Sequence, residues 1–314
     1  MESEAIETRA LAWRADQRVA WPMKRLGHAQ LGATEGAMIY HLARDWVSGR
    51  RPVVELGSFL GASASLLGKG LMENPGWDGA AHLHCYDLFE AKFGNMAAFI
   101  RDRIDPSFRD GEDFLPLFRG QTEEVAPAIT IHKGDFEAAK WRGGRIDLLF
   151  VDISKTPALN RVILERFFPG LEPGEGLMVN QDFHNPGNPW VQTSMGYLLD
   201  YFEVLEPRAD DSVLMRLRRP IPTEVLVAAG RYETLSGAER LARVERLIAA
   251  WRGAGWDARY LELVQARLLI QAGAVSEGHA LIEAARAAAG APDPQGHFFW
   301  EQRCETVRGG LWAE

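Results

Sequence analysis

The stretch that decides the fold spans residues 53–61 and reads Val53-Val54-Glu55-Leu56-Gly57-Ser58-Phe59-Leu60-Gly61. An apolar run is followed here by two spaced glycines, and then by an apolar segment of helical length, Ala62–Met72. This order predicts a strand, a tight turn and a helix. Gly57 can adopt a positive φ angle and let a ligand lie against the backbone, while Gly61 permits close packing at the helix start. Ser58 or Ser63 could cap the free N–H groups of that helix or contact the ligand.

The region around this turn has the pattern of an α/β fold. From Pro52 to Leu217, short apolar runs alternate with helix-length segments, as in βα units around a parallel sheet. The expected strands are Val53–Leu56, Leu83–Tyr86, Ile129–His132, Ile146–Val151, Gly176–Val179, Tyr201–Leu205 and Ser212–Leu217. The last two are close enough in sequence to pair as an antiparallel hairpin. The sequence therefore predicts a Rossmann-like, mainly parallel seven-stranded sheet with an antiparallel edge hairpin.

Three regions follow from these patterns. Residues 1–50 predict an N-terminal helical cap, with its clearest helix over Glu35–Val47, and residues 51–219 form the α/β domain. After Pro220-Ile221-Pro222, residues 220–314 are rich in Ala, Leu, Arg and Glu, which predicts an all-α region of helical hairpins. Such hairpins stack in the manner of tetratricopeptide proteins, although no clean repeat of that period is present. We expect a structural or partner-binding role there, with a homodimer interface as one form of it.

Two acidic positions accompany the first turn. Asp87 ends the second expected strand, where a carboxylate can accept hydrogen bonds from both hydroxyls of a ribose. Gly134-Asp135 ends the third strand and suits a contact with adenine. The first turn lacks the G-x-G of the dinucleotide fingerprint G-x-G-x-x-G, which argues against a nicotinamide cofactor. Taken alone, residues 55–63 could also be a purely structural turn.

The combination of E-x-G in the first turn, an acid after strand two and G-D after strand three resembles class I S-adenosylmethionine-dependent methyltransferases. The resemblance covers about residues 35–217. It implies that S-adenosylmethionine is the cofactor, with its amino group near Glu55. The implied cofactor-binding residues are Glu55, Gly57, Ser58, Gly61, Ser63, Asp87, Leu88, Gly134, Asp135 and Asp152.

The reacting end should lie beyond the carboxyl ends of the fourth and fifth strands. Asp152 and Lys155 follow the fourth strand, and Asp182 and His184 follow the fifth, so we expect these four side chains to converge. The non-catalytic alternatives are a helix-capping role for Asp152, a surface position for Lys155 and a solvated position for His184. Trp190 is our candidate for an aromatic residue in the acceptor pocket.

These segments resemble two groups of O-methyltransferases. Val151-Asp152-Ile153-Ser154-Lys155 is similar to the V-D-x-x-K stretch of cation-dependent, catechol-type enzymes, and Asp87-Leu88-Phe89 is similar to the D-T-F of macrocin-type sugar enzymes. The resemblance implies that Asp152 and Asp182 bind Mg²⁺, and that Lys155 or His184 acts as general base. The chain departs from both patterns at Gln181-Asp182, where one expected ligand is missing. Without a metal, His184 as the base is the simpler mechanism.

The whole-chain composition limits the function classes. The 314 residues carry a net charge of −8, which argues against nucleic acid as a partner. With two cysteines, no signal-like N-terminus and no long apolar run, we expect a cytoplasmic protein that does not cross a membrane. The leading hypothesis is O-methylation of a small molecule, such as a sugar unit or a phenolic natural product. The alternatives are an N- or peptide-methyltransferase whose partner is held by the C-terminal helices, and a catalytically inactive binding scaffold.

Overall fold

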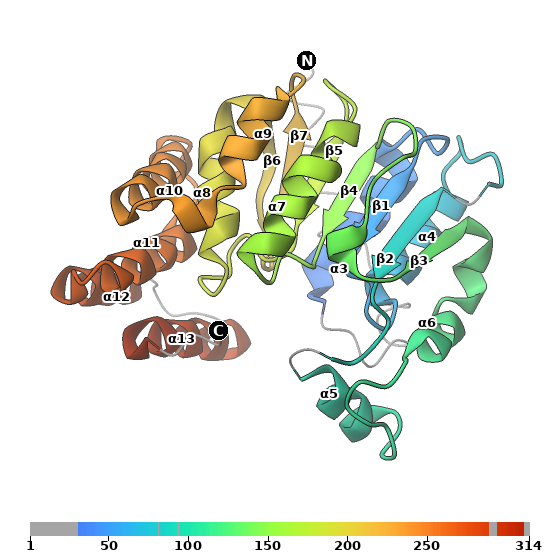
Figure 1. The fold of residues 1–314 in the computed structure, drawn as a ribbon, viewed down its shortest axis with the longest axis horizontal. Helices are drawn as coiled ribbons and strands as arrows, with labels where there is room; N and C mark the ends of the chain where they lie inside the picture. The colour runs from blue at the N-terminus through green and yellow to red at the C-terminus, as the bar shows by residue number, and fades with distance from the viewer. Residues whose placement is uncertain (1–30, 81, 93–94, 289–293, 311–314) are drawn as a thin grey trace. The chain divides into compact units, whose positions relative to one another are not determined.

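The computed structural model describes residues 31–80, 82–92, 95–288 and 294–310. Its strands form one seven-stranded sheet in the order β3-β2-β1-β4-β5-β7-β6 (Figure 1). The strands are β1 (Val53–Leu56), β2 (Leu83–Asp87), β3 (Ile129–Lys133), β4 (Leu148–Val151), β5 (Leu177–Asn180), β6 (Phe202–Ala209) and β7 (Ser212–Leu217). Strands β1 to β5 pair in parallel, and β7 is antiparallel to β5. The predicted Rossmann-like fold with an antiparallel edge hairpin is confirmed.

Several strand ends differ from the prediction by one or more residues, including β2 and β3, which each run one residue further. β4 begins at Leu148 because Ile146 forms an isolated bridge with Leu171 instead of joining the ladder. β5 runs one residue further, to Asn180. β6 begins at Phe202 rather than Tyr201 and continues past Pro207 to Ala209. Because β6 lies at the edge of the sheet, the N–H that proline lacks is not needed by a neighbouring strand.

The helices follow in chain order. They are α3 (Ala33–His41), the π-helix η2 (Leu42–Trp46), α4 (Ala62–Met72), α5 (Met96–Arg103), α6 (Leu115–Gln121), α7 (Pro157–Arg166), α8 (Pro189–Leu198), α9 (Thr223–Ala229), α10 (Gly237–Gly253), α11 (Arg259–Gln271), α12 (Val275–Ala287) and α13 (Pro294–Gly309). Short 3₁₀ turns are η3 (Glu123–Ala128), η4 (Phe136–Ala138), η5 (Phe168–Gly170), η6 (Leu199–Tyr201) and η7 (Tyr232–Thr234).

The chain divides into two compact units. The first comprises residues 1–153, 170–181 and 204–218, and the second comprises residues 154–169, 182–203 and 219–314. The segments that carry α7 and α8 therefore group with the C-terminal helices. The domain boundary at residues 219/220 stays a prediction, and residues 1–30 of the expected N-terminal cap lie outside the described residues.

The core of the first unit lies between the sheet and the helices α3 and α4. Met38, Ile39 and Leu42 pack with Leu66 and Leu67 of α4 and are fully buried. Figure 1 shows α3 and α4 behind the strands β1 to β3. The predicted helix over residues 35–47 is present, but its second half is a π-helix, which Val47 closes through an N–H bond to the Leu42 carbonyl oxygen. π-Helical turns are rare and recur near functional sites.

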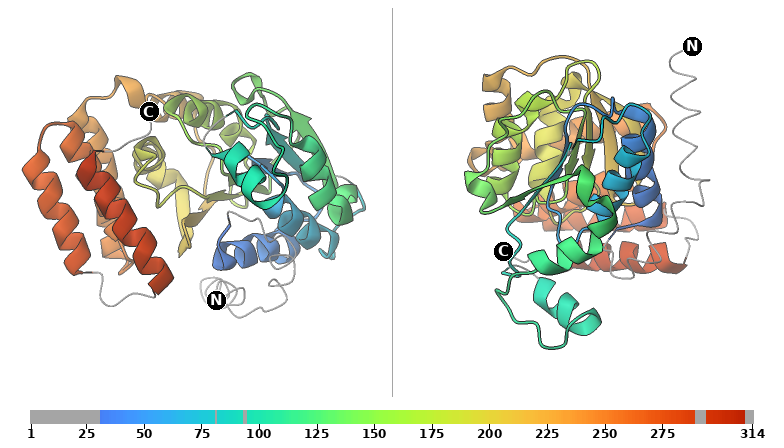
Figure 2. Two further views of the ribbon diagram at one scale, coloured as in Figure 1. Left: turned by 90° about the horizontal axis from the view of Figure 1, so that it is seen from below. Right: turned by 90° about the vertical axis from the view of Figure 1, so that its right-hand side faces the viewer.

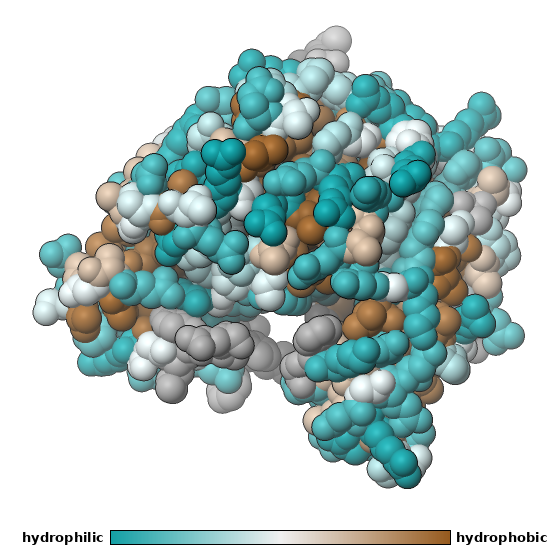
Figure 3. All heavy atoms as spheres, viewed as in Figure 1, coloured by the Kyte–Doolittle hydropathy of each residue, from teal (hydrophilic) through white to brown (hydrophobic). Residues whose placement is uncertain are grey.

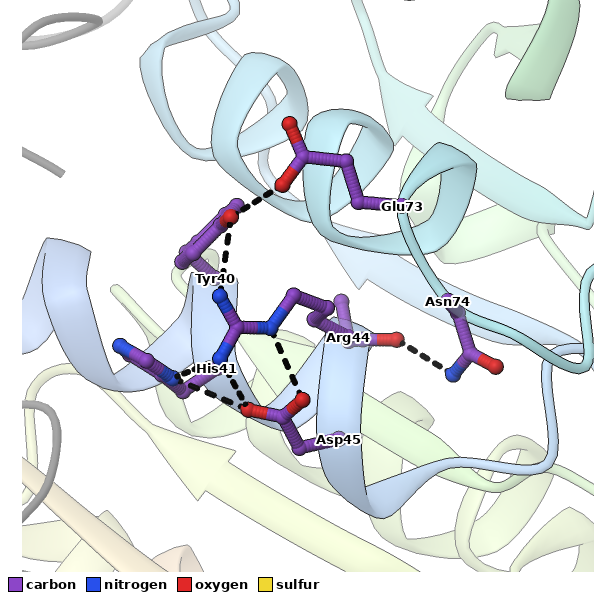
Figure 4. A network of polar contacts seen from close by, with 7 residues as sticks. Tyr40, His41, Arg44, Asp45, Glu73 and Asn74 are labelled. Atoms are coloured by element: carbon purple, nitrogen blue, oxygen red, sulfur yellow. Dashed lines mark hydrogen bonds and ion pairs between the residues drawn. The ribbon is translucent and has the colours of Figure 1, made fainter. Parts of the chain in front are cut away.

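A polar network fixes this π-helical turn to the end of α4 (Figure 4). The Tyr40 hydroxyl donates to Glu73, and Arg44 donates to the Tyr40 oxygen at 3.3 Å and to Asp45 at 2.7–2.8 Å. Asn74 Nδ2 donates to the carbonyl oxygens of residues 43 and 47 at 2.9 and 3.0 Å. These bonds satisfy carbonyls that an α-helix would have used, so they explain how the irregular turn is stable.

The second unit is helical. α10 begins with a capping box, in which Ser236 and Glu239 bind each other's backbone N–H groups. Val244, Leu247 and Trp251 form the buried stripe of this helix, and α10 to α12 follow one another as neighbours (Figure 2). The predicted all-α C-terminal region is confirmed, whereas its description as stacked hairpins stays a prediction.

The surface of the described residues is mainly polar. Val275 is the one large hydrophobic side chain counted as exposed in the ranges that the structure covers. The face in Figure 3 accordingly shows hydrophobic residues only in small, separate patches. No helix in the described part of the chain is long and apolar enough to cross a membrane.

Candidate cofactor and acceptor site

The turn after β1 has the backbone that its two glycines predict. Gly57 and Gly61 both have φ angles of 90°, in the left-handed region that favours glycine. A Cβ atom at Gly57 would lie 2.6 Å from the carbonyl oxygen of Asp152, which is backbone and cannot swing away. Gly61 is the N-cap of α4. The turn is therefore closely packed against the end of β4 and leaves no room for a side chain.

Glu55 is buried at the base of this turn. Its carboxylate is fully inaccessible, and Oε2 accepts a hydrogen bond from the Ser58 hydroxyl at 2.5 Å. The other oxygen, Oε1, has no hydrogen-bond partner of ordinary geometry among the described residues. Burial raises the pKa of Glu55 to about 7, against a smaller lowering by Ser58 and Ser63. An unsatisfied buried carboxylate oxygen is suited to a ligand cation or N–H donor.

This buried acid should make stability depend on pH. Because the pKa of Glu55 is about 7 in the folded chain and near 4.5 in the unfolded one, the unfolded state loses its proton first. The free energy of unfolding should therefore fall as pH rises through that interval, by about 3 kcal/mol from this group. Denaturant unfolding of wild type and Glu55→Gln at pH 5 and pH 8 measures the difference. Parallel pH profiles for the two proteins would contradict the assignment.

Asp87 holds the turn after β1 from the end of β2. Its Oδ2 accepts hydrogen bonds from the N–H groups of Ser58 and Phe59, each at 2.9 Å, and Oδ1 accepts one from Phe89 at 2.8 Å. A carboxylate has about four acceptor positions. These backbone bonds use most of the acceptor positions, and the expected bonds to the ribose hydroxyls stay a prediction.

Two phenylalanines at this turn were missed by the sequence prediction. Phe59 and Phe89 have φ angles of 41° and 56°, which is uncommon for a bulky residue. Both N–H groups bind Asp87, and both rings contact Phe114 edge-on at 5.5 and 5.7 Å. Strained residues that persist are held by their surroundings and cluster at functional sites. No pattern in the sequence indicates them, since the strain depends on Asp87 and on the packing of Phe114.

The other predicted cofactor residues lie at the ends of neighbouring strands. Gly134 has a φ angle of 152°, and its N–H donates to the Asp87 carbonyl oxygen at 3.0 Å. Leu88 follows Asp87 directly and is half-buried. Asp135 is exposed, and its carboxylate caps η4 through the Glu137 N–H at 2.9 Å. The structure thus brings the ends of β1, β2 and β3 together as the sequence predicts.

Glu35 is a further acidic residue that the sequence prediction did not place in the site. It is buried at the start of α3 and accepts a hydrogen bond from the Ser212 hydroxyl. Burial raises its pKa well above the usual range, and the charges of Asp152 and Asp210 raise it further. Glu35 is therefore close enough to Asp152 to interact with it. The sequence signal that could have indicated this burial is an acid in the first turn of a mostly apolar helix.

Lys155 and Asp182 are in contact in the second unit. Lys155 Nζ lies 2.5 Å from Asp182 Oδ2, with the lysine side chain about half exposed and the carboxylate 8% exposed. Asp182 Oδ1 accepts a longer bond from Asn185 at 3.3 Å. Because Lys155 follows β4 and Asp182 follows β5, the sequence predicts that the two residues lie close together. The structure shows their contact. Lys155 is also exposed, as the alternative of a surface lysine expects, so its functional role stays a prediction.

The structure places His184 in the interior of the second unit. It is fully buried, so the solvated alternative is wrong, and its ring meets Phe183 and Tyr260 edge-on at 5.2 and 5.8 Å. This aromatic environment favours packing over proton transfer, and the role of general base stays a prediction. Trp190 is partly buried and donates from Nε1 to the Ser154 carbonyl oxygen at 2.7 Å.

The predicted Mg²⁺ ligands do not have the surroundings of a metal centre. Asp182 already pairs with the Lys155 ammonium. The ligand pair of both related patterns corresponds here to Gln181-Asp182 or Asp182-Phe183, so one expected ligand is missing. Within the described ranges, no group of three or more His, Cys, Asp or Glu residues could hold a metal ion. The donor set does not fit the carboxylate-rich coordination that Mg²⁺ prefers.

Comparison with known proteins finds a similarity to methyltransferases over part of the chain. Residues 54–183 match the family model described as a methyltransferase domain. No curated protein matches the chain. The structure is similar to the O-methyltransferase NovP, at 16% identity and a TM-score of 0.48 over 61% of this chain and 83% of that one. It is also similar to the calicheamicin methyltransferase CalS11, at 15% identity and a TM-score of 0.46 over 68% and 92% of the two chains. It is also similar to an O-methyltransferase from Bacillus cereus in complex with S-adenosylhomocysteine, at 14% identity and a TM-score of 0.38 over 69% of this chain and 90% of that one.

These structural similarities are too distant to identify a substrate. The match of residues 54–183 and the order of the sheet strands nevertheless agree with the motifs in the first three βα turns. Over residues 54–183 the chain is therefore similar to a methyltransferase domain, which agrees with the family predicted from the sequence.

Proposed function

We propose that the protein transfers a methyl group from S-adenosylmethionine to a hydroxyl oxygen of a small molecule, such as a sugar unit or a phenolic natural product. The observation that carries this proposal is the contact between Lys155 and Asp182, which follow β4 and β5 directly. Ligands of open α/β sheets bind beyond these strand ends. A hydroxyl must lose its proton during methylation, and a lysine–carboxylate pair is suited to assist that loss.

The proposed cofactor site is formed by the turns after β1, β2 and β3. Glu55 Oε1, which lacks a partner among the described residues, would receive the amino group of the cofactor. Asp87 would accept one ribose hydroxyl, and Asp135 would contact adenine. Gly57 allows this turn to lie directly against the end of β4. The bound cofactor supplies an electrophilic methyl group on sulfur, and the protein mainly has to align it with the nucleophile.

On the acceptor half, Lys155 and Asp182 have distinct tasks. The Lys155 ammonium would donate a hydrogen bond to the acceptor oxygen and stabilise negative charge as it develops there. The mostly buried Asp182 carboxylate would hold the ammonium in place and take up the released proton. His184 packs against aromatic rings and has no assigned step in this mechanism.

Calorimetry with S-adenosylmethionine and S-adenosylhomocysteine tests the cofactor assignment. Micromolar binding of both is expected. A panel of hydroxylated and amine-containing acceptors, followed by mass spectrometry, then distinguishes the hypotheses. Methylation of amines or peptides alone would favour the N- or peptide-methyltransferase, and the absence of cofactor binding would leave the inactive binding scaffold.

Removal of divalent metals should leave methyl transfer unchanged. The Lys155 ammonium occupies the carboxylate that Mg²⁺ would need, so we expect the rate after extensive EDTA treatment to stay within about twofold of the untreated rate. The assay is product formation before and after chelation, with Mg²⁺ added back as the control. A loss of activity that Mg²⁺ restores would support the metal ligands Asp152 and Asp182 instead.

Two partner assignments stay proposals. We propose a small-molecule acceptor and no nucleic acid, in line with the net charge of −8. A homodimer through the C-terminal helices is tested by light scattering of the purified full chain.

A further inference from the structure

The loop that follows β5 is bound by a buried arginine from a distant helix. Arg267 of α11 donates from Nη1 to the Pro186 carbonyl oxygen at 2.7 Å, across 81 positions of sequence. Its side chain belongs to the buried polar set, at 6% exposure, and burial lowers its pKa to about 10. A buried guanidinium is costly unless it is hydrogen-bonded. This hydrogen bond therefore stabilises the buried guanidinium of Arg267 as well as the loop.

Two aromatic contacts join the same loop to the same helices. The Phe183 ring stacks on Trp251 of α10, with centroids 5.4 Å apart and planes at 24°. The His184 ring meets Tyr260 of α11 edge-on at 5.8 Å. Phe183, His184 and Trp251 are each fully buried. Aromatic pairs in these geometries fix ring orientation as well as contributing burial.

The other side of the loop is held by α8. Gln192 is fully buried, and its Nε2 donates to the carbonyl oxygens of Phe183 at 2.7 Å and Asn185 at 3.2 Å. The Asn185 N–H in turn binds the Asp182 carbonyl oxygen at 3.0 Å. The backbone that carries Asp182 is thus held between α8 and the pair α10–α11.

We infer that α10 and α11 position the acceptor-binding loop, and that Arg267 is the positioning residue through which they act. Residues 182–188 carry Asp182, the partner of Lys155, so a displacement of the loop would move the pair that meets the acceptor. The helical region is then a part of the methyl-transfer apparatus and not only an appended module. The kinetic part of this inference rests on the proposed function, whereas the structural part does not.

The test compares Arg267→Met, Arg267→Lys and Arg252→Met in the full chain. Arg252 lies on α10 with its side chain 62% exposed and pairs with Glu262 of α11 at 2.9 Å, which makes it a matched control. Hydrogen exchange measured by mass spectrometry should rise about tenfold in peptides covering residues 182–190 of Arg267→Met. The KM for the acceptor should also rise about tenfold, with the KM for S-adenosylmethionine unchanged. In Arg267→Lys the hydrogen exchange and the KM for the acceptor should both lie between those of wild type and Arg267→Met. Arg252→Met should match wild type in both.

Each outcome decides the inference. Unchanged exchange in residues 182–190 would overturn it, as would faster exchange with an unaltered KM for the acceptor, because the contact would then be structural only. If Arg267→Met does not fold, Tyr260→Leu removes the neighbouring contact with His184 and is measured in the same way. If wild type binds no S-adenosylhomocysteine, the proposed function fails, and the exchange measurement still decides whether Arg267 holds the loop.

Discussion

Replacement of Gly57 by alanine should weaken cofactor binding at least about tenfold. The residue has a φ angle of 90°, which costs a non-glycine residue about 1–2 kcal/mol. The added Cβ would also lie 2.6 Å from the Asp152 carbonyl oxygen and 2.9 Å from its carbonyl carbon. Because both atoms are backbone, the turn after β1 or the end of β4 must move. We expect a total destabilisation of about 3 kcal/mol and at least about a tenfold loss of affinity for S-adenosylhomocysteine.

Gly79 offers the matched control for this prediction. Its φ angle is 85°, but a Cβ there would meet no atom within 4 Å. Gly79→Ala should therefore carry the conformational strain alone, at about 1 kcal/mol, and should bind the cofactor normally. Thermal unfolding and calorimetry on both variants separate strain from collision. Equal losses of affinity in the two variants would show that the close approach of Gly57 to Asp152 is not what matters.

The parts of the site that the sequence could predict are those governed by local rules. Gly57 and Gly61 follow an apolar run and precede a helix, so their left-handed backbone follows from the pattern. The contact between Lys155 and Asp182, 27 positions apart, follows from the rule that strand ends in a parallel sheet share one edge. Both conclusions require only the order of the elements and no detail of packing.

The parts that could not be predicted depend on contacts between distant segments. Asp87 was assigned to a ribose, yet most of its acceptor capacity binds the N–H groups of Ser58, Phe59 and Phe89. His184 lies in a loop rich in Pro, Gly and Asn, which indicates exposure. It is buried because Tyr260 of α11 packs against it. A local pattern carries no information on which distant side chain will cover a loop.

Disruption of the pair Lys155–Asp182 should lower the rate of methyl transfer without weakening cofactor binding. In Asp182→Asn the carboxylate no longer holds the ammonium 2.5 Å away, and in Lys155→Met the ammonium is gone. Assistance with proton transfer of this kind contributes about 10²-fold or more to rates, so each substitution should reduce kcat/KM by about that factor. Binding of S-adenosylhomocysteine should stay within about twofold of wild type, because the predicted cofactor residues of the first three turns are untouched.

The double variant provides the decisive comparison. If Lys155 and Asp182 act as one unit, Lys155→Met/Asp182→Asn should lose about as much activity as either single variant, and not the product of the two losses. Arg246 and Asp200 form an ion pair in the same unit, with side chains 41% and 65% exposed, and serve as the control. An exposed pair of this kind contributes little, so Arg246→Met/Asp200→Asn should retain near wild-type activity. Multiplicative losses at Lys155 and Asp182 would instead mean that the two residues act separately, and undiminished activity would remove both from the mechanism.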